Sequence, residues 1–409
     1  MTAAAETADG RDTEAGAAET TAKPSLWRNS DFRRFFAGQF VTNAGDSLYT
    51  VAVLWLVFEL SGSTVLTGVA NAVLLLPWLL QILAGPVVDR LPLRPVLVGS
   101  QLLQGVVVLA LPLAAATGHL SVGVIFAVVP LLTLATLLMA PMQATIVPRI
   151  VPDEQLSGAN SALATVTLGL DMIFDALGGG FIAVFGATAL FLFDAGTFAL
   201  AALLFAGIAV SRSTDGDGPA RETGGDDPDA TASDADDELI LGSYVADLRD
   251  GIAVLRGTVF VELVLTTAVA NLATGVTLAV LPAYGDALGG PAVYGALLGA
   301  LGVGRLVGSL LAPYLEGVAY GRLLFVGDAV GAASWLGAVL APSSALTVVL
   351  FGLAWVPAGV SGVLTSTLNQ TVFPADLLGR VSTIKGTASG ATLPLGSLVG
   401  GVVAELLGT

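Results

Sequence analysis

Cysteine is absent from the 409-residue chain, and His119 is its only histidine. The lack of cysteine excludes disulfides and thiol redox chemistry, and a single histidine leaves no Cys/His metal cluster. No GxxxxGK[ST] phosphate-binding loop is present, so we do not expect the chain itself to use ATP. Since an enzyme would need catalytic or metal-ligand clusters of this kind, we predict neither enzymatic activity nor a cofactor.

Charge is also scarce, at 12% of residues against 55% hydrophobic residues, and the mean hydropathy is +0.84. Globular domains carry about 25% charged residues, so this composition indicates an all-α polytopic membrane protein. Stretches such as VLLLPWLLQILAG are apolar all round, which favours helices over the alternating strands of a membrane barrel. A spanning helix needs about 20 apolar residues. Eleven runs are predicted to span the bilayer, at 35–59, 64–88, 95–116, 120–147, 159–184, 187–210, 258–284, 291–315, 322–341, 345–371 and 382–407.

The basic residues define a topology. Fifteen of the 16 fall on one side of the membrane if every run spans it, whereas loops on the other side, such as ELSGST and VFGAT, contain neither Lys nor Arg. The positive-inside rule makes the basic side cytoplasmic. We therefore predict a multi-pass protein of the plasma membrane with a cytoplasmic N-terminus, without a nucleic-acid partner.

Three segments outside the runs are predicted to be cytoplasmic. Residues 1–30 form a disordered tail, and the acidic stretch 211–238 is a disordered linker. Residues 239–257 have the spacing of an amphipathic helix on the membrane surface. An acidic surface with only two lysines is typical of halophilic proteins; the alternative is an acidic linker without special meaning.

An internal repeat is predicted from two weak matches. An offset of 222 residues aligns VPDEQLSGANS with FPADLLGRVST and Gly178–Gly179 with Gly400–Gly401. An offset of 227 aligns Pro86 with Pro313 and Asp89 with Glu316. Duplication predicts two pseudo-symmetric bundles, of six spans over 31–210 and of five spans over 258–409. In that register a twelfth span is missing after the eleventh.

Four stretches resemble the major facilitator superfamily of secondary transporters, within its drug and siderophore exporter branch of macrolide-efflux and enterobactin-exporter type proteins. They are FRRFFAGQFVTNAGDSLYTVAVLWLVFELSGS, GPVVDRLPLR, VPDEQLSGANS and LFDAGTFALAALL. The resemblance implies that Gly85, Asp89, Arg90 and Arg94 form a conformational motif whose ion pairs hold one state and break in another. The alternative is that Arg90 and Arg94 anchor a loop and Asp89 caps a helix.

Ionisable residues inside the runs are the best site candidates, because charge in a bilayer usually lines a cavity or forms a pair. Asp46 lies near mid-depth with Asn43 one turn away, and it is the preferred proton or cation site. Asp171 and Asp175 share a helical face, where two carboxylates favour a bound proton or cation. Arg305 demands a carboxylate, an anionic substrate or a path to the interface. For each of these residues the alternative is a structural role, in which the side chain is paired with a group on a neighbouring helix. Asp194 fits a structural hydrogen-bonding role.

In the resembling family, the runs that contain Gln143, Asn271 and Trp355 line a central cavity with the first run. These side chains are therefore candidates for substrate contact, with packing as the alternative for Trp355. The function predicted is proton-coupled export of small amphipathic molecules by a monomer through alternating access. The alternative is a transport-inactive scaffold or sensor of the same fold.

Overall fold

The computed structural model describes residues 26–77, 92–137, 139–209, 259–372, 386 and 389–408. These residues form thirteen α-helices and two short 3-10 helices, with no strand among them. The first part of the chain supplies α1 (Ser30–Ser61), α2 (Thr64–Leu74), α4 (Leu93–Val108), α5 (Ala110–Ala116), α6 (Val122–Thr136), α7 (Met139–Ile150), α8 (Leu156–Phe185) and α9 (Ala187–Ala206). The second supplies α11 (Val259–Gly289), α12 (Pro291–Leu315), α13 (Tyr320–Val339), α14 (Ser344–Val372) and α16 (Thr392–Leu407).

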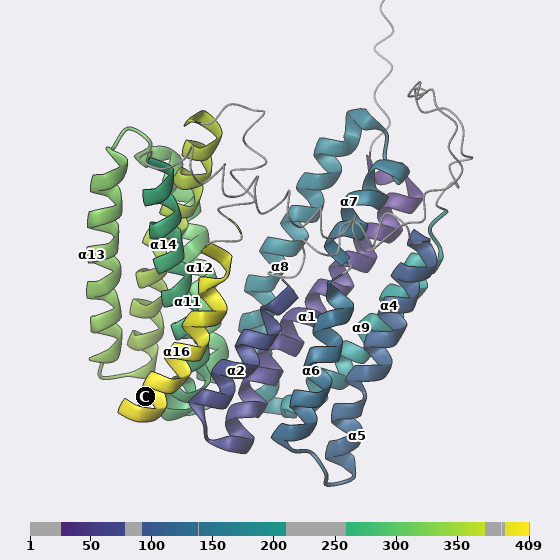
Figure 1. Ribbon diagram of the computed structural model, residues 1–409, viewed down its shortest axis with the longest axis horizontal. Coiled ribbons are helices and arrows are strands. Elements are labelled where there is room, and N and C mark those ends of the chain that lie inside the picture. Colours follow the sequence, from purple (N-terminus) through teal and green to yellow (C-terminus); the bar gives the residue numbers. More distant parts are fainter. Residues whose placement is uncertain are drawn as a thin grey trace, which may run out of the picture.

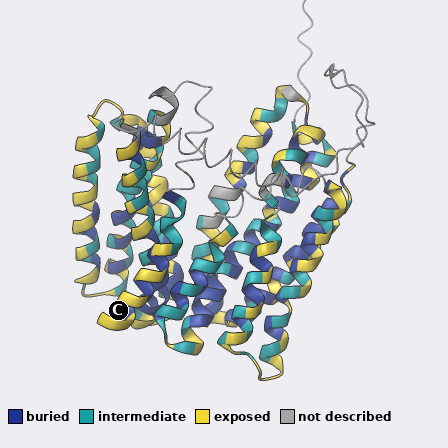
Figure 2. Cartoon of the chain, viewed as in Figure 1, coloured by how far each residue is buried: buried dark blue, intermediate teal, exposed yellow. Residues whose placement is uncertain are grey.

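The helices confirm an all-helical membrane protein. Seven stretches are long and apolar enough to cross a bilayer, and four further apolar helices are shorter. Each of the eleven predicted runs contains a described helix. Within the described residues one run is broken, since α4 gives way to α5 at Leu109. Large apolar side chains stay exposed on outer faces, as Phe325 and Leu336 do on α13, where lipid tails would cover them (Figure 2).

Helix α1 begins five residues before its predicted start, because Asn29 caps it. The Asn29 side chain accepts hydrogen bonds from the backbone nitrogens of Asp31 and Phe32, at 3.0 and 3.1 Å. Trp27, within a 3-10 turn at Leu26–Arg28, packs edge-on against Phe32, so order begins before the predicted end of the tail at residue 30. The helix ends at Gly62, whose φ of 62° is open to glycine at little cost.

The two bundles stand side by side and converge at the end where the C-terminus lies (Figure 1). Between them, α8 packs on α12, and α2 packs on α16 and α11. At the α8–α12 crossing, a Cβ added to Gly179 would lie within 3.0 Å of the Gly295 backbone, so both positions need glycine. At the α2–α16 crossing, Asn71 Nδ2 donates to Ser397 Oγ at 2.9 Å, and both side chains are buried.

The predicted repeat pairs Gly179 with Gly401, and both lie at crossings between the bundles. Gly401 packs against the backbone of Thr64, as Gly179 packs against that of Gly295. Of the other aligned segments, 84–89 and 373–383 lie outside the described residues, whereas the segments aligned with them are described. So do the predicted linker 211–238 and the predicted amphipathic helix 239–257.

Only one residue of the predicted conformational motif is described. Gly85, Asp89 and Arg90 fall outside the described ranges. Arg94, on α4, donates to the Ala206 carbonyl at the end of α9. A cation at a helix C-terminus satisfies carbonyls that lack an intrahelical partner. Arg94 therefore joins α4 to the C-terminal end of α9, which is the end predicted to face the cytoplasm.

Candidate functional site

A cavity of about 400 Å³ lies within the first bundle. Six of its polar lining residues come from α1, and α4, α6, α7 and α9 supply the others. The polar lining residues are Gln39, Thr42, Asn43, Asp46, Tyr49, Thr50, Gln104, Thr133, Thr136, Gln143 and Asp194. Along α1, each step from residue 39 to 42 or 43, to 46, and to 49 or 50 is three or four residues, which places the six on one helical face.

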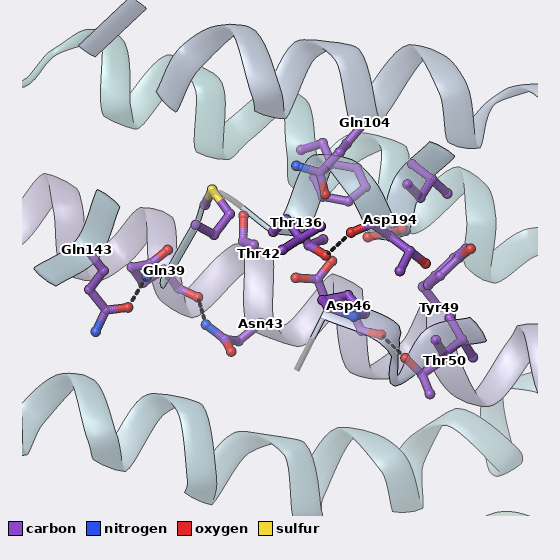
Figure 3. Close-up of a pocket in the computed structure, with 17 residues that line it drawn as sticks. Gln39, Thr42, Asn43, Asp46, Tyr49, Thr50, Gln104, Thr136, Gln143 and Asp194 are labelled. Carbon is purple, nitrogen blue, oxygen red and sulfur yellow. Dashed lines mark hydrogen bonds between the residues drawn. The ribbon is translucent and has the colours of Figure 1, made fainter. Parts of the chain in front are cut away.

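Two carboxyl groups meet in this cavity. Asp46 lies near the middle of α1, and Asp194 lies on α9 at 0% exposure. Figure 3 shows their side chains pointing toward each other, and the two groups interact electrostatically. Thr197 Oγ1 donates to Oδ1 of Asp194 at 3.2 Å, whereas Oδ2 has no hydrogen-bond partner among the described residues. An acceptor left open beside a second carboxyl group is a suitable place for a proton or a small cation.

Amide side chains order the opposite end of the cavity. Gln39 Nε2 donates to Gln143 Oε1 at 2.8 Å, which joins α1 to α7, and Asn43 Nδ2 donates to the Gln39 carbonyl at 2.7 Å. Thr42 donates to Gln101 Oε1 at 2.8 Å, which joins α1 to α4. These bonds hold the α1 face that carries Asp46 in a fixed orientation (Figure 3).

A second cavity, of about 560 Å³, lies within the other bundle between α11, α12, α13 and α14. Its wall includes Arg305, whose guanidinium carbon lies 4.7 Å from the centre of the Trp355 ring. Arg305 Nη2 donates a long hydrogen bond, 3.4 Å, to Thr274 Oγ1. Asn271 also lines this cavity, and its Nδ2 donates to the Ser389 carbonyl at 2.9 Å.

The predicted candidates therefore divide into two groups. Asp46, Asn43 and Gln143 line the first cavity, and Arg305, Asn271 and Trp355 line the second. The other two candidates are on α8. Asp175 interacts electrostatically with Tyr294 of α12, at the contact between the bundles, and the side chain of Asp171 lies outside the described residues.

Three cavity residues were missed or read differently from the sequence. Asp194 was assigned a structural role, although a carboxylate in an apolar run was itself the signal. Gln39 precedes Asn43 by four residues, so the helical spacing pointed to it. Asp328, exposed on α13, lines the second cavity, and its position as the seventh residue of a predicted run was a usable signal.

No group of three or more possible metal ligands occurs in the part of the chain that the structure describes. Both cavities are instead lined by hydroxyl groups, amide groups and two charged side chains each, on mainly apolar walls. Ligand sites for small organic molecules have this character.

Comparison with known proteins gives a family match over nearly the whole chain. Residues 21–409 match a family described as "Transmembrane secretion effector". No curated protein sequence matches the chain significantly.

Solved transporter structures share the fold at low sequence identity. A bacterial homologue of the human lysosomal transporter Spinster, inward-facing and unoccupied, is 13% identical, with a TM-score of 0.65 over 91% of this chain and 82% of that one. A bacterial homologue of the iron transporter ferroportin, inward-facing, is 16% identical, with a TM-score of 0.63 over 93% and 98%. The nucleoside transporter NupG is 12% identical, with a TM-score of 0.64 over 92% and 91%.

Proposed function

The chain belongs to the transmembrane secretion effector family of the major facilitator superfamily, and is thus a secondary transporter and not an enzyme; from this we propose that it exports small amphipathic molecules in exchange for protons. One observation carries the proton-coupling part of the proposal. Asp46 and Asp194 face each other inside a bundle, lining a cavity large enough for water. Ionisable groups at membrane depth mark proton or ion pathways.

Alternating access is supported by where the bundles touch. The contacts between named residues of the two bundles involve α1 from Trp55 onward, α2, the second half of α8, the first half of α12 and α16 from Ser397 onward. Helix α11 also contacts α1 and α2. The contacts between named residues lie toward the end that carries the loops at Gly62, Gly186 and Gly290, which contain no Lys or Arg. Because the positive-inside rule makes this end extracellular, we assign the structure to an inward-facing state, like the two inward-facing relatives.

The proposal also covers location and topology. We propose that the protein is a monomer in the plasma membrane, with a cytoplasmic N-terminus and with eleven spans in two bundles at 31–210 and 258–409. Its acidic, lysine-poor soluble segments suit a medium of high salt. Rocking of one bundle against the other would expose the two cavities to each side in turn.

The test is flux driven by a pH gradient in everted vesicles at high salt, with a panel of amphipathic fluorescent compounds and macrolides. Asp46→Asn is expected to abolish gradient-driven uptake while the protein stays folded, because an amide cannot carry the transported proton. Asp286→Asn is the matched control, since Asp286 is exposed near the end of α11 and outside both cavities. It is expected to transport as the parent does.

Unchanged flux and unchanged pH dependence in Asp46→Asn would refute its role in coupling. Loss of flux in both variants would show that the defect does not depend on the cavity. Absence of flux from the parent across the whole panel would favour the alternative, a transport-inactive scaffold or sensor of the same fold.

A further inference from the structure

We infer that the cavity between α11, α12, α13 and α14 binds an oxyanion, and that the exported molecule is an amphipathic anion with its carboxylate, or a group like it, on Arg305. The binding part stands on the structure alone. The identity of the anion as cargo rests on the proposed function.

Arg305 is a cation without a counter-ion. It lies 15 residues into α12 and makes no ion pair within the described ranges. Its guanidinium carbon lies 4.7 Å from the centre of the Trp355 ring, which is a cation–π contact. The N–H donors lie in the plane of the guanidinium, and among them the structure gives only the long bond from Nη2 to Thr274. The remaining donors are available to a ligand.

Trp355 supplies a second donor that lacks an acceptor. The residue is only 7% exposed, and its Nε1 has no hydrogen-bond partner in the part of the chain described. A buried N–H left unpaired is costly. An oxyanion bound in this cavity would accept from Arg305, because arginine binds carboxylates through two parallel bonds, and it would reach the buried Trp355 Nε1 only where the indole ring turns toward it.

The rest of the wall fits an apolar body attached to that anion. Trp335, Ala354, Ala358 and Pro357 line the cavity with Trp355. The volume of about 560 Å³ lies within the usual range for small-molecule sites. A bicyclic aromatic ring with one carboxylate is therefore a suitable probe.

Asp328 provides a test of whether the second cavity prefers a negatively charged ligand. It lines the same cavity from α13 and is exposed, and it forms no ion pair with Arg305. A carboxylate there opposes a bound anion. Removing Asp328 should thus strengthen anion binding, whereas removing Arg305 should weaken it, and the two changes form a matched pair.

The experiment compares three naphthalene probes by calorimetric titration of the purified full-length protein. The probes are 2-naphthoate, 2-naphthylmethanol and 2-naphthylmethylammonium. The parent is expected to bind naphthoate at least tenfold more tightly than the other two. Arg305→Gln should lose that preference while still binding the alcohol, which shows that the variant is folded. Arg305→Lys should keep part of the preference, and Asp328→Asn should raise naphthoate affinity severalfold.

Equal binding of the three probes by the parent, or an unchanged preference in Arg305→Gln, would overturn the oxyanion site. An anionic lipid headgroup has the same chemistry as the proposed cargo, so phosphatidylglycerol is titrated as a competitor. If it displaces naphthoate through Arg305 at comparable concentrations, the site is a lipid site and the assignment to cargo fails.

Flux separates this inference from the proposed function. Arg305-dependent binding without any flux driven by the pH gradient would leave the oxyanion site standing and refute proton-coupled export. Gradient-driven flux of the alcohol and the amine, without preference for naphthoate, would leave export standing and refute the anionic cargo.

Discussion

Gly179→Ala should shift the protein away from the state in which the bundles touch. The new Cβ would lie within 3.0 Å of the Gly295 backbone and of the Pro291 carbonyl oxygen, well inside the roughly 3.5–4.0 Å at which non-bonded atoms pack best. Backbone atoms cannot move aside as a flexible side chain can, so the helices must separate. Overpacking of this kind costs about 1–3 kcal/mol. That is a shift of about 5- to 150-fold in a conformational equilibrium.

The absence of cysteine allows a direct measurement of this shift. Leu60→Cys and Leu407→Cys place spin labels on exposed residues of α1 and α16 at the end where the bundles converge. Electron–electron distance measurements should show a larger population of long distances in Gly179→Ala. Gly180→Ala is the control, because a Cβ at Gly180 meets nothing within 4 Å. Identical distance distributions in the parent and both variants would refute the steric reasoning.

Three further changes test other contacts. Ser397→Ala leaves the buried amide of Asn71 without its acceptor and should also lengthen the label distances, by a population shift worth about 1–3 kcal/mol; unchanged distances would show that this bond does not hold the state. Glu405→Gln should act in the same direction, because the Glu405 carboxylate accepts from the backbone nitrogen and hydroxyl of Thr64 at 2.8 and 3.0 Å. Arg94→Gln removes a donor from the end of α9 and should lower the unfolding free energy in detergent by about 0.3–1 kcal/mol; an unchanged unfolding midpoint would contradict this.

The fold was predictable because the bilayer restricts which secondary structures can span it. A long apolar stretch in lipid must satisfy its own backbone hydrogen bonds, and a helix does so without a partner. Apolar length alone therefore located all the helices that the structure describes within the runs. The break at Leu109 was not predicted, because nothing in the hydropathy of that run changes there.

Single residues of the two sites could be predicted from the sequence, but the residues that pack against them could not. An ionisable group in an apolar run stands out in the sequence, and for this reason Asp46 and Arg305 were both found. The partner of each depends on which helices pack together, and helix packing has no such signal. Asp194 lies 148 residues from Asp46, and its side chain was taken to be structural. Arg305 was expected to need a carboxylate, an anionic substrate or a path to the interface, and the structure places Trp355 against it.

The two cavities differ in charge, because the first contains two carboxyl groups and the second contains Arg305 together with the exposed Asp328. This difference gives a physical reason for the proposed exchange. Asp46 and Asp194 face each other in one bundle, and Arg305 stands without a counter-ion among the described residues of the other. Closing a cavity to water strengthens every charge interaction inside it, and an ionised group left unpaired there costs several kcal/mol. A proton on the carboxyl groups and an oxyanion on the guanidinium each remove that cost in their own bundle. The loaded forms would then change conformation most readily, which ties movement of the bundles to their cargo.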